Sequence, residues 1–418
     1  MSRWTRMVTG ALVTCAAASA CSKEATAPPP AVCSAPQGSS AEARTLAGDD
    51  ATFAVDLFQP AVASAGTGQN FILSPHGVFS TLAMIDVGAA NETDAQIQSA
   101  LHLPGNAASI APAYAALACE DETDGTSNGD QLSIASSVWA QKGMAFEPSF
   151  LTTLAKGYDA PLQQVDYETN ATAAVTAIDG WVSTQTQGEI PSLLQPTDLT
   201  STTRLVLVNA IYFKGAWETA FDPSQTSPRP FTLSDGTAVT TPTMDGFVTL
   251  RSGSTSGLSV YELGYKGGAM AMDFLVPSGS VADLEASLTS ASLGAAVASL
   301  GQARANVEVQ LPKFAFHTHL ALAPILSGLG VADLFDPAKA DLEGMDGAKD
   351  LYVSTFVQEA IIQVDETGTV AAAATAGGAV AASYTLPTTI DRPFLFLIRD
   401  TSNGSLLFMG HVEDPRQD

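Results

Sequence analysis

The fold class that this sequence predicts is α+β, in one large domain that follows an N-terminal leader. Two observations come directly from the residues. No low-complexity segment interrupts residues 50–415, and two segments near the C terminus, 358–364 and 392–400, have the composition of strands. A set of short motifs, given below, is the third observation. We expect the domain to cover residues 50–418.

Residues 1–20 have the pattern of an export signal. Arg3 and Arg6 precede an apolar stretch of small residues, which leads to Cys21. We expect a bacterial lipoprotein in which Cys21 carries the lipid, and this lipid is the one membrane contact predicted. Cleavage after Ala20 with release of a soluble protein is the alternative. The expected location is therefore the outer membrane or cell surface, or the extracellular medium.

Residues 21–49 are predicted to form a flexible tether, because they contain three consecutive prolines and little apolar bulk. No later segment is long and apolar enough to cross a bilayer. Cys33 and Cys119 are the thiols that remain in the body of the exported chain, where disulfides persist. They can form a disulfide, but Cys33 lies in the tether, so a disulfide and two free thiols both stay open as alternatives.

The chain is strongly acidic, with 43 Asp and Glu against 18 Lys and Arg and a formal net charge of -25. This balance argues against nucleic acid or an anionic membrane surface as a partner. It favours either cationic partners or high solubility alone.

The most unusual segment is residues 367–383, which contain no charged residue, no proline and nothing larger than valine. A surface loop of an acidic protein is normally polar and solvated. The segment connects the two predicted strands, and its threonines share one parity with alanines, which is typical of a latent strand. A plain flexible connection is the alternative.

Residues 366–375 closely resemble the hinge of the reactive-centre loop of an inhibitory serpin. Other segments resemble the same family in the same order along the chain, so the resemblance runs from about residue 50 to residue 415. These segments are residues 70–75, 82–89, 93–104, 209–217, 221–223 with Thr226, 311–314, 329–331 with Phe335, 393–396, 398–400, 404–405 and 407–412. The resemblance implies the serpin fold, with three β-sheets, about nine helices and an exposed reactive-centre loop at about residues 366–391.

This resemblance implies an inhibitor and not an enzyme, and it implies no cofactor. Its partner is a target serine protease, whose nucleophile attacks one bond of the loop and forms a covalent acyl complex. The hinge side of the cut loop then inserts into the main sheet, the protease is deformed, and deacylation stalls. We expect a monomer. A non-inhibitory serpin that acts as a binding or structural protein, and an inhibitor of a cysteine protease, are the alternatives.

The hinge positions are small and uncharged after the first. By resemblance they are Glu366, Gly368, Thr369, Ala371, Ala372, Ala373, Ala374 and Thr375. Gly368 allows the backbone to swing, and the run that follows can enter a sheet without burying a charge. Alternate residues should face one side of the inserted strand: Thr369, Ala371, Ala373, Thr375, Gly377, Ala379 and Ala381. Val370 replaces a usual acidic residue on the opposite parity and is not expected to block insertion.

Two counts place the reactive bond between Ala382 and Ser383. One runs forward from Gly368 and the other runs back from Pro393, and they agree. Ala382 would suit a protease with a small hydrophobic pocket, such as an elastase-like or alpha-lytic-like enzyme. The alternatives are nearby cuts after Val380, after Ala381 and at Tyr384.

At the gate where insertion begins, Glu366 and Lys313 resemble the pair that ties the loop base to a neighbouring strand. Trp217 resembles the aromatic residue at the same gate. Ordinary surface pairing and core packing would produce the same residue types.

Under the middle of the sheet, Ser74, Asn209 and Gln358 match a polar cluster that must part before the loop can enter. Gln358 stands where the family usually has histidine, and Gly77 stands where it often has serine. Hydrogen bonding and pH sensitivity of this cluster are therefore expected to differ from the family's. Gln358 can bond Asn209 without titrating.

No metal site is predicted. His317 and His319 should share one face of a strand, but the sequence shows no third ligand near them. No nucleophile and base emerge as a pair, which agrees with a protein that is not an enzyme.

Overall fold

The structure is a computed structural model, and it describes residues 41–66, 68–126, 130–369 and 386–417. Several predictions lie outside the described residues. They are the export signal, Cys21, Cys33, the hinge positions 371–375 and the reactive bond Ala382–Ser383.

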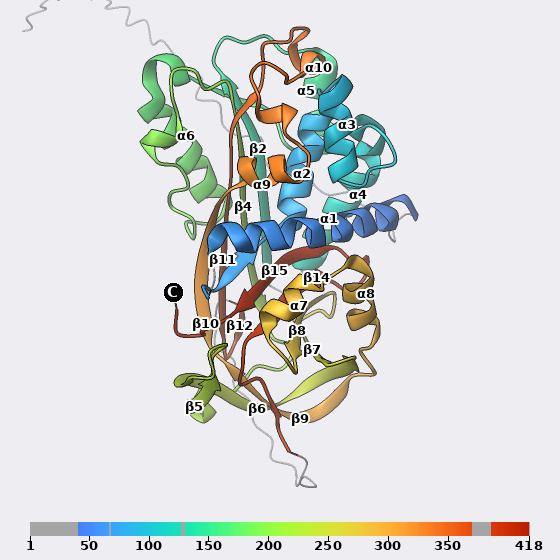
Figure 1. Ribbon diagram of the computed structural model, residues 1–418, viewed down its shortest axis with the longest axis vertical. Coiled ribbons are helices and arrows are strands. Elements are labelled where there is room, and N and C mark those ends of the chain that lie inside the picture. Colours follow the sequence, from blue (N-terminus) through green and yellow to red (C-terminus); the bar gives the residue numbers. More distant parts are fainter. Residues whose placement is uncertain (1–40, 67, 127–129, 370–385, 418) are drawn as a thin grey trace, which may run out of the picture. The chain divides into compact units, whose positions relative to one another are not determined.

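Ten α-helices occur in the described part of the chain, against about nine expected. They are α1 (Ala41–Ala65), α2 (Pro75–Asp86), α3 (Asn91–Ala100), α4 (Ala107–Gly125), α5 (Pro148–Gly157), α6 (Tyr167–Gln185), α7 (Val281–Ala286), α8 (Ser290–Ala298), α9 (Leu322–Gly328) and α10 (Glu343–Asp346). Figure 1 shows α1 crossing the middle of the domain, where it contacts α2, α4, α9 and β15 (Leu406–Val412). None of these helices is long and apolar enough to cross a membrane.

The predicted boundary between tether and domain is wrong. Helix α1 begins at Ala41, inside the segment 21–49 that was expected to be flexible. Alanine and leucine favour helix, and the helix carries Ala43, Leu46 and Ala47 into the core, where at most 3% of each residue is exposed. Burial of this apolar face extends the folded domain towards the N terminus.

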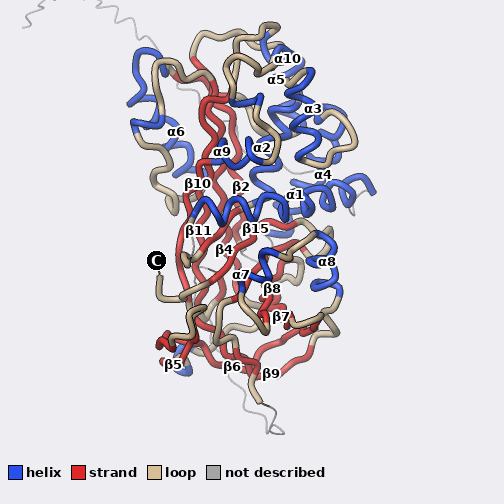
Figure 2. Tube along the Cα trace, in the orientation of Figure 1, coloured by secondary structure: helices blue, strands red, loops and turns tan. Residues whose placement is uncertain are grey.

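The main sheet has six strands in the order β10-β11-β12-β4-β2-β3. The strands are β2 (Gln131–Gln141), β3 (Gln163–Val165), β4 (Leu205–Ala216), β10 (Phe314–Ala321), β11 (Val353–Asp365) and β12 (Gly368–Thr369). The long strands β4 and β11 run parallel and pair directly over most of their length. Figure 2 shows them as the long strands through the domain, and the strand expected at residues 358–364 is part of β11.

The second sheet has nine strands, and eight of them form the path β1-β15-β14-β8-β7-β6-β9-β13, with β5 beside β6. The remaining bounds are β1 (Phe71–Leu73), β5 (Ser227–Thr232), β6 (Ala238–Thr255), β7 (Leu258–Gly264), β8 (Met270–Pro277), β9 (Arg304–Pro312), β13 (Thr388–Thr389) and β14 (Phe394–Asp400). Residues 251–255 of β6 pair with β7, whereas earlier residues of β6 pair with β5 and β9. The three expected sheets are therefore present, and β6 joins two of them into one hydrogen-bonded network.

Strand β4 is buried on both faces, which explains its nearly continuous apolar sequence. Val206 and Val208 point to one side and pack in a cluster with Ile178 of α6, whereas Ile211 and Phe213 pack in the cluster of the second sheet. The period of two in a strand produces this division. The main sheet thus lies between α6 and the second sheet.

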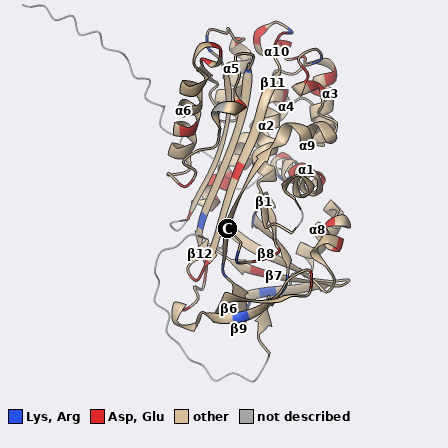
Figure 3. Cartoon of the chain, turned by 60° about the vertical axis from the view of Figure 1, so that its left-hand side comes forward, with Lys and Arg blue, Asp and Glu red and all other residues tan. Residues whose placement is uncertain are grey.

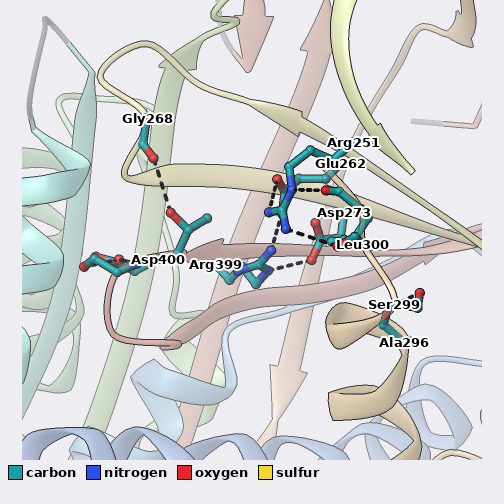
Figure 4. A network of polar contacts seen from close by, with 12 residues as sticks. Arg251, Glu262, Gly268, Asp273, Ala296, Ser299, Leu300, Arg399 and Asp400 are labelled. Carbon is teal, nitrogen blue, oxygen red and sulfur yellow. Dashed lines mark hydrogen bonds and ion pairs between the residues drawn. The ribbon is translucent and has the colours of Figure 1, made fainter. Parts of the chain in front are cut away.

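A row of charged side chains crosses four strands of the second sheet (Figure 4). Arg399 of β14 donates to Asp273 of β8, with Nε 2.6 Å from Oδ2, and also pairs with Glu262 of β7. Arg251 of β6 donates to Glu262 over 2.7 Å. Burial raises the pKa of Asp273 to about 6 even though the Arg399 guanidinium lowers it. Glu262 and Asp273 lie opposite each other on β7 and β8, and Arg399 contacts both, so each buried carboxylate has an arginine partner.

Acidic positions are spread over helices and strands, whereas basic positions are few (Figure 3). The excess of acid is therefore a property of the domain and does not belong to one element.

Candidate functional site

The main sheet is partly open at one end. Strands β4 and β11 pair directly as far as Ala360 and Ile211, and beyond that point β12 lies between them. Thr369 of β12 pairs with Val364 on one side and with Gly215 on the other. Two of the predicted hinge positions, Gly368 and Thr369, therefore already form a short strand between β4 and β11.

Gly368 is a glycine for a steric reason. Its φ is 148°, and a Cβ built on it would lie 2.0 Å from the carbonyl oxygen of Gly215. Any other side chain would force the two strands apart. The chain reaches Gly368 through a tight turn, in which Oδ1 of Asp365 accepts from the amide of Thr367 at 2.9 Å and from its hydroxyl at 2.7 Å.

The hinge is held on its inner side by two stacked aromatic rings. The hydroxyl oxygen of Tyr265 lies 2.7 Å from Oγ1 of Thr369, and both residues are at most 1% exposed. The ring of Tyr265 stacks on Trp217, with 4.8 Å between centroids. Trp217 donates its indole N–H to the carbonyl oxygen of Asp365 at 3.0 Å and its amide to that of Thr367 at 2.9 Å. Sequence reasoning found Trp217 and missed Tyr265, because no motif marks the tyrosine.

The Glu366 carboxylate accepts hydrogen bonds from two side chains that are distant in the sequence. Lys313 donates to its Oε2 at 2.7 Å, and the Thr226 hydroxyl donates to its Oε1 at 2.6 Å. Burial alone would raise the pKa of Glu366, but these two hydrogen bonds hold it below its usual range. The structure thus places Lys313 against Glu366, and it adds Thr226, which the sequence did not single out for this contact.

Gln358 joins three segments under the middle of the main sheet. Its Oε1 accepts from the amide of Ser74 at 3.0 Å, and its Nε2 donates to the carbonyl oxygen of Ser74 at 2.8 Å and to Oδ1 of Asn209 at 2.6 Å. All three residues are fully buried. One neutral amide therefore bridges β11, β4 and the chain that leads into α2.

The same cluster explains Gly77. A Cβ at this position would lie 2.3 Å from the side-chain amide of Asn209, so there is no room for a serine in this arrangement. Nδ2 of Asn209 instead donates to Oγ of Ser136 at 2.9 Å, and Ser136 lies 3.0 Å from Oγ of Ser80. Ser80 and Ser136 supply hydroxyls on this side of Asn209, and sequence reasoning missed both.

The other predicted residues lie away from this site. Cys119 in α4 is disulfide-bonded, and the pairing of Cys33 with Cys119 stays a prediction because Cys33 is outside the described residues. His317 and His319 both face Glu359, at 2.6 and 2.9 Å from their Nδ1 atoms. Among the residues that the structure describes, no group of three or more His, Cys, Asp or Glu is arranged to hold a metal ion.

The fold and the site define a class of protein: an α+β domain in whose main sheet the two residues of β12 lie between the long strands β4 and β11. A model of one family, described as Serpin (serine protease inhibitor), matches residues 49–415. The chain belongs to the serpin family.

Similar proteins agree with this assignment. Leukocyte elastase inhibitor A from Mus musculus is 36% identical over 381 residues, which cover 88% of this chain and 99% of that protein. Leukocyte elastase inhibitor from Homo sapiens is 35% identical over the same shares. Among solved structures, native protease nexin-1 with heparin has a TM-score of 0.78 at 29% identity, over 89% of this chain and all of that chain.

Proposed function

We propose that this protein is an irreversible suicide-substrate inhibitor of serine proteases that cleave after small residues, with the reactive bond between Ala382 and Ser383. The observation that carries the proposal is the position of Gly368 and Thr369 between β4 and β11. A loop that already contributes two residues to the sheet can continue in the same groove once its far end is cut. The similarity to proteins named leukocyte elastase inhibitors supports the small-residue preference.

The chemistry begins as ordinary proteolysis. The hydroxyl of the protease serine attacks the carbonyl carbon of Ala382, and the amine of Ser383 leaves after it receives the proton from the protease histidine. An ester now joins the loop to the protease. Water would normally hydrolyse this ester, so the inhibitor must insert its loop before water attacks.

The observed register predicts where the inserted strand meets the buried polar cluster. Six residues beyond Thr369 along the loop is Thr375. The same distance back along β11 and β4, from the residues that pair with Thr369, are Gln358 and Asn209. Insertion therefore breaks the 2.6 Å bond between those two side chains and brings the Thr375 hydroxyl between them. A hydroxyl can both donate and accept, so it can replace that bond.

Insertion is driven by new backbone hydrogen bonds. At roughly 0.5–1.5 kcal/mol each, over about a dozen residues, they provide a free energy on the order of 10 kcal/mol. This value is comparable with the stability of a whole domain, so it is sufficient to deform a bound protease.

Export and anchoring form the second part of the proposal. The signal pattern of residues 1–20 supports export, and Cys21 supports lipid attachment in a bacterial envelope, with secretion after cleavage at Ala20 as the other outcome. The inhibitor would act as a monomer that protects its own cell. Labelling with a radioactive fatty acid and a Cys21→Ser control distinguishes the two locations.

The inhibitory function is tested by mixing the mature protein with a pancreatic-elastase-type protease. We expect an adduct that survives boiling in detergent, and mass spectrometry should place the cut after Ala382. Thr369→Arg is the matched control: a charge at a buried position should stop insertion and convert the inhibitor into a substrate. Clean cleavage without an adduct, with proteases of several specificities, would support the non-inhibitory alternative. An adduct with a cysteine protease alone would support the thioester alternative.

A further inference from the structure

Tyr265 occupies a position that the proposed mechanism does not yet use. It lies in the connection between β7 and β8, and its hydroxyl reaches Thr369 in the main sheet. The hydrogen bond of 2.7 Å therefore connects this β7–β8 connection to the main sheet and is separate from the backbone bonds that hold β12. Thr369 is the last residue of β12, so this contact lies at the front of the inserted segment.

The ring of Tyr265 is held rigidly. It stacks on Trp217 at an angle of 10° and meets Phe213 edge-on at 4.9 Å. Gly215 leaves space for it, because a Cβ there would lie 2.7 Å from the Tyr265 ring. The backbone amide of Tyr265 donates to the carbonyl oxygen of Met270 at 2.9 Å. These contacts fix the position of the Tyr265 hydroxyl, so Thr369 must occupy a matching position to bond to it.

Withdrawal of the hinge would affect the two hydroxyls differently. Thr369 could exchange its partner for water, but Tyr265 is fully buried, and within the described part of the chain Thr369 is its hydroxyl's hydrogen-bond partner. A buried hydroxyl without a partner is unfavourable. Burial also raises the pKa of Tyr265 above its usual range, so the hydroxyl stays neutral and can donate or accept.

We propose that Tyr265 is a positioning residue that keeps the hinge at its first inserted step and thereby favours trapping over hydrolysis. The link to trapping rests on the proposed inhibitory function, whereas the effect on the hinge does not. After acylation, insertion competes with attack by water on the ester. A loop whose first residues are already in place starts insertion sooner, so a larger share of the acyl complexes is trapped.

The test uses four variants of the mature protein. Tyr265→Phe keeps the ring and removes the hydroxyl. Thr369→Val removes the threonine hydroxyl that bonds to Tyr265, and Thr369→Ser keeps a hydroxyl at that position. Tyr158→Phe is the matched control, because the Tyr158 hydroxyl is also buried and donates to a backbone oxygen, that of Ala107 at 3.0 Å, far from the hinge in the sequence.

The first measurement is amide hydrogen exchange at residues 366–369 of the uncleaved protein, which needs no protease. We expect Tyr265→Phe and Thr369→Val to speed this exchange about three- to tenfold, as expected for loss of one hydrogen bond, and the double variant to add little more. Thr369→Ser and Tyr158→Phe should leave it unchanged. Wild-type exchange in Tyr265→Phe, or fully additive effects in the double variant, would overturn the inference.

The second measurement separates trapping from acylation. In Tyr265→Phe we expect the number of inhibitor molecules consumed per protease trapped to rise several-fold, with the acylation rate unchanged. An altered acylation rate with unchanged consumption would contradict the role in trapping. If the wild-type protein forms no adduct with any protease, the proposed function fails, but the exchange measurement still decides the position of the hinge.

Discussion

At the scale of single residues, the site depends on neutral side chains with complete hydrogen bonds. Gln358 makes three such bonds without carrying a titratable group. Gly77 gives the Asn209 amide the space it occupies. Gln358 and Gly77 therefore act on the same Asn209 side chain, one by a hydrogen bond and the other by leaving space for the amide.

Removing the Gln358 side chain tests this arrangement. Gln358→Ala leaves the Ser74 amide and the Asn209 amide oxygen buried without this partner, so we expect the free energy of unfolding to fall by about 2–4 kcal/mol. Urea denaturation followed by circular dichroism measures the loss. Gln358→His should restore part of it and make the midpoint depend on pH, since histidine titrates near pH 6.5. A loss below about 0.5 kcal/mol in the alanine variant would contradict the assigned role.

The pair of Lys313 with Glu366 is a second residue-scale prediction. Side-chain exposure is 36% for Lys313 and 10% for Glu366, so the pair is partly screened by water. In a double-mutant cycle with Lys313→Met and Glu366→Gln, we expect a coupling free energy of about 1 kcal/mol. Hinge exchange should increase in both single variants. Zero coupling would show that Thr226 alone holds Glu366.

At the scale of elements, the strands follow their sequence closely and the boundaries do not. The strand expected at residues 358–364 is present in β11, and the one expected at 392–400 is present as β14. The start of α1 was missed, because a short alanine-rich segment has no period that separates helix from tether. The three expected sheets are present, and only the pairing partners of β6 show that this strand joins two of them.

The candidate site was predictable to the extent that a motif marks its residues. Trp217, Lys313 and Glu366 lie in recognisable segments, and the structure brings them to one end of the main sheet. Tyr265 meets Thr369 only through tertiary packing, and Ser136 meets Asn209 only because β2 and β4 are paired neighbours in the main sheet. No local pattern in the sequence encodes such a contact.

The charged row across β6, β7, β8 and β14 gives an element-scale prediction. Arg399→Met would leave Asp273, which is fully buried, without its main partner. Breaking a buried pair in this way costs about 3–5 kcal/mol, so we expect a large fall in thermal stability. The double variant Arg399→Met with Asp273→Asn should recover most of the loss. No recovery would mean that the row contributes through packing and not through charge.

At the scale of the whole molecule, several buried acids share one direction of pKa shift. Burial is the largest cause in each, and it raises the pKa to about 7 in Asp86 and Asp400 and to about 6 in Asp121, Asp130 and Asp273. His76 is also buried, between Asp50 at 2.7 Å and Asp121 at 3.8 Å. Burial lowers the pKa of His76, but the two carboxylates together raise it by more than burial lowers it. The pKa of His76 therefore lies above its usual value of 6.5.

These shifts predict that stability increases on mild acidification. A carboxyl with a raised pKa binds protons more readily in the folded state, so the folded state gains stability as pH falls from about 7 towards 4. His76 contributes stability below pH 6.5 and loses it as pH rises through its higher folded pKa. Lower pH also reduces the repulsion of a chain with a net charge of -25. Below about pH 4 the trend reverses, because Glu366, Asp341 and Asp414 have lowered pKa values.

Thermal denaturation at about pH 5.5 and about pH 8 measures this trend. We expect the protein to be more stable at the lower pH, by about 2 kcal/mol or more. Asp121→Asn should reduce this difference in stability, because Asp121 of α4 is one of the buried acids with a raised pKa. Greater stability at pH 8 would contradict the predicted sign.

The two residues of β12 have a consequence for how the loop can evolve. If the loop inserts as proposed, the pairing of β12 with β4 and β11 sets the register of the residues that enter the sheet after it, and a shift of one residue exchanges the two faces of a strand. Deleting one residue between Thr369 and Thr375 would then place Thr375 on the opposite face from Gln358. Under the proposed insertion, an odd change in the length of this stretch is therefore not tolerated, whereas the identity of its small residues is much less restricted.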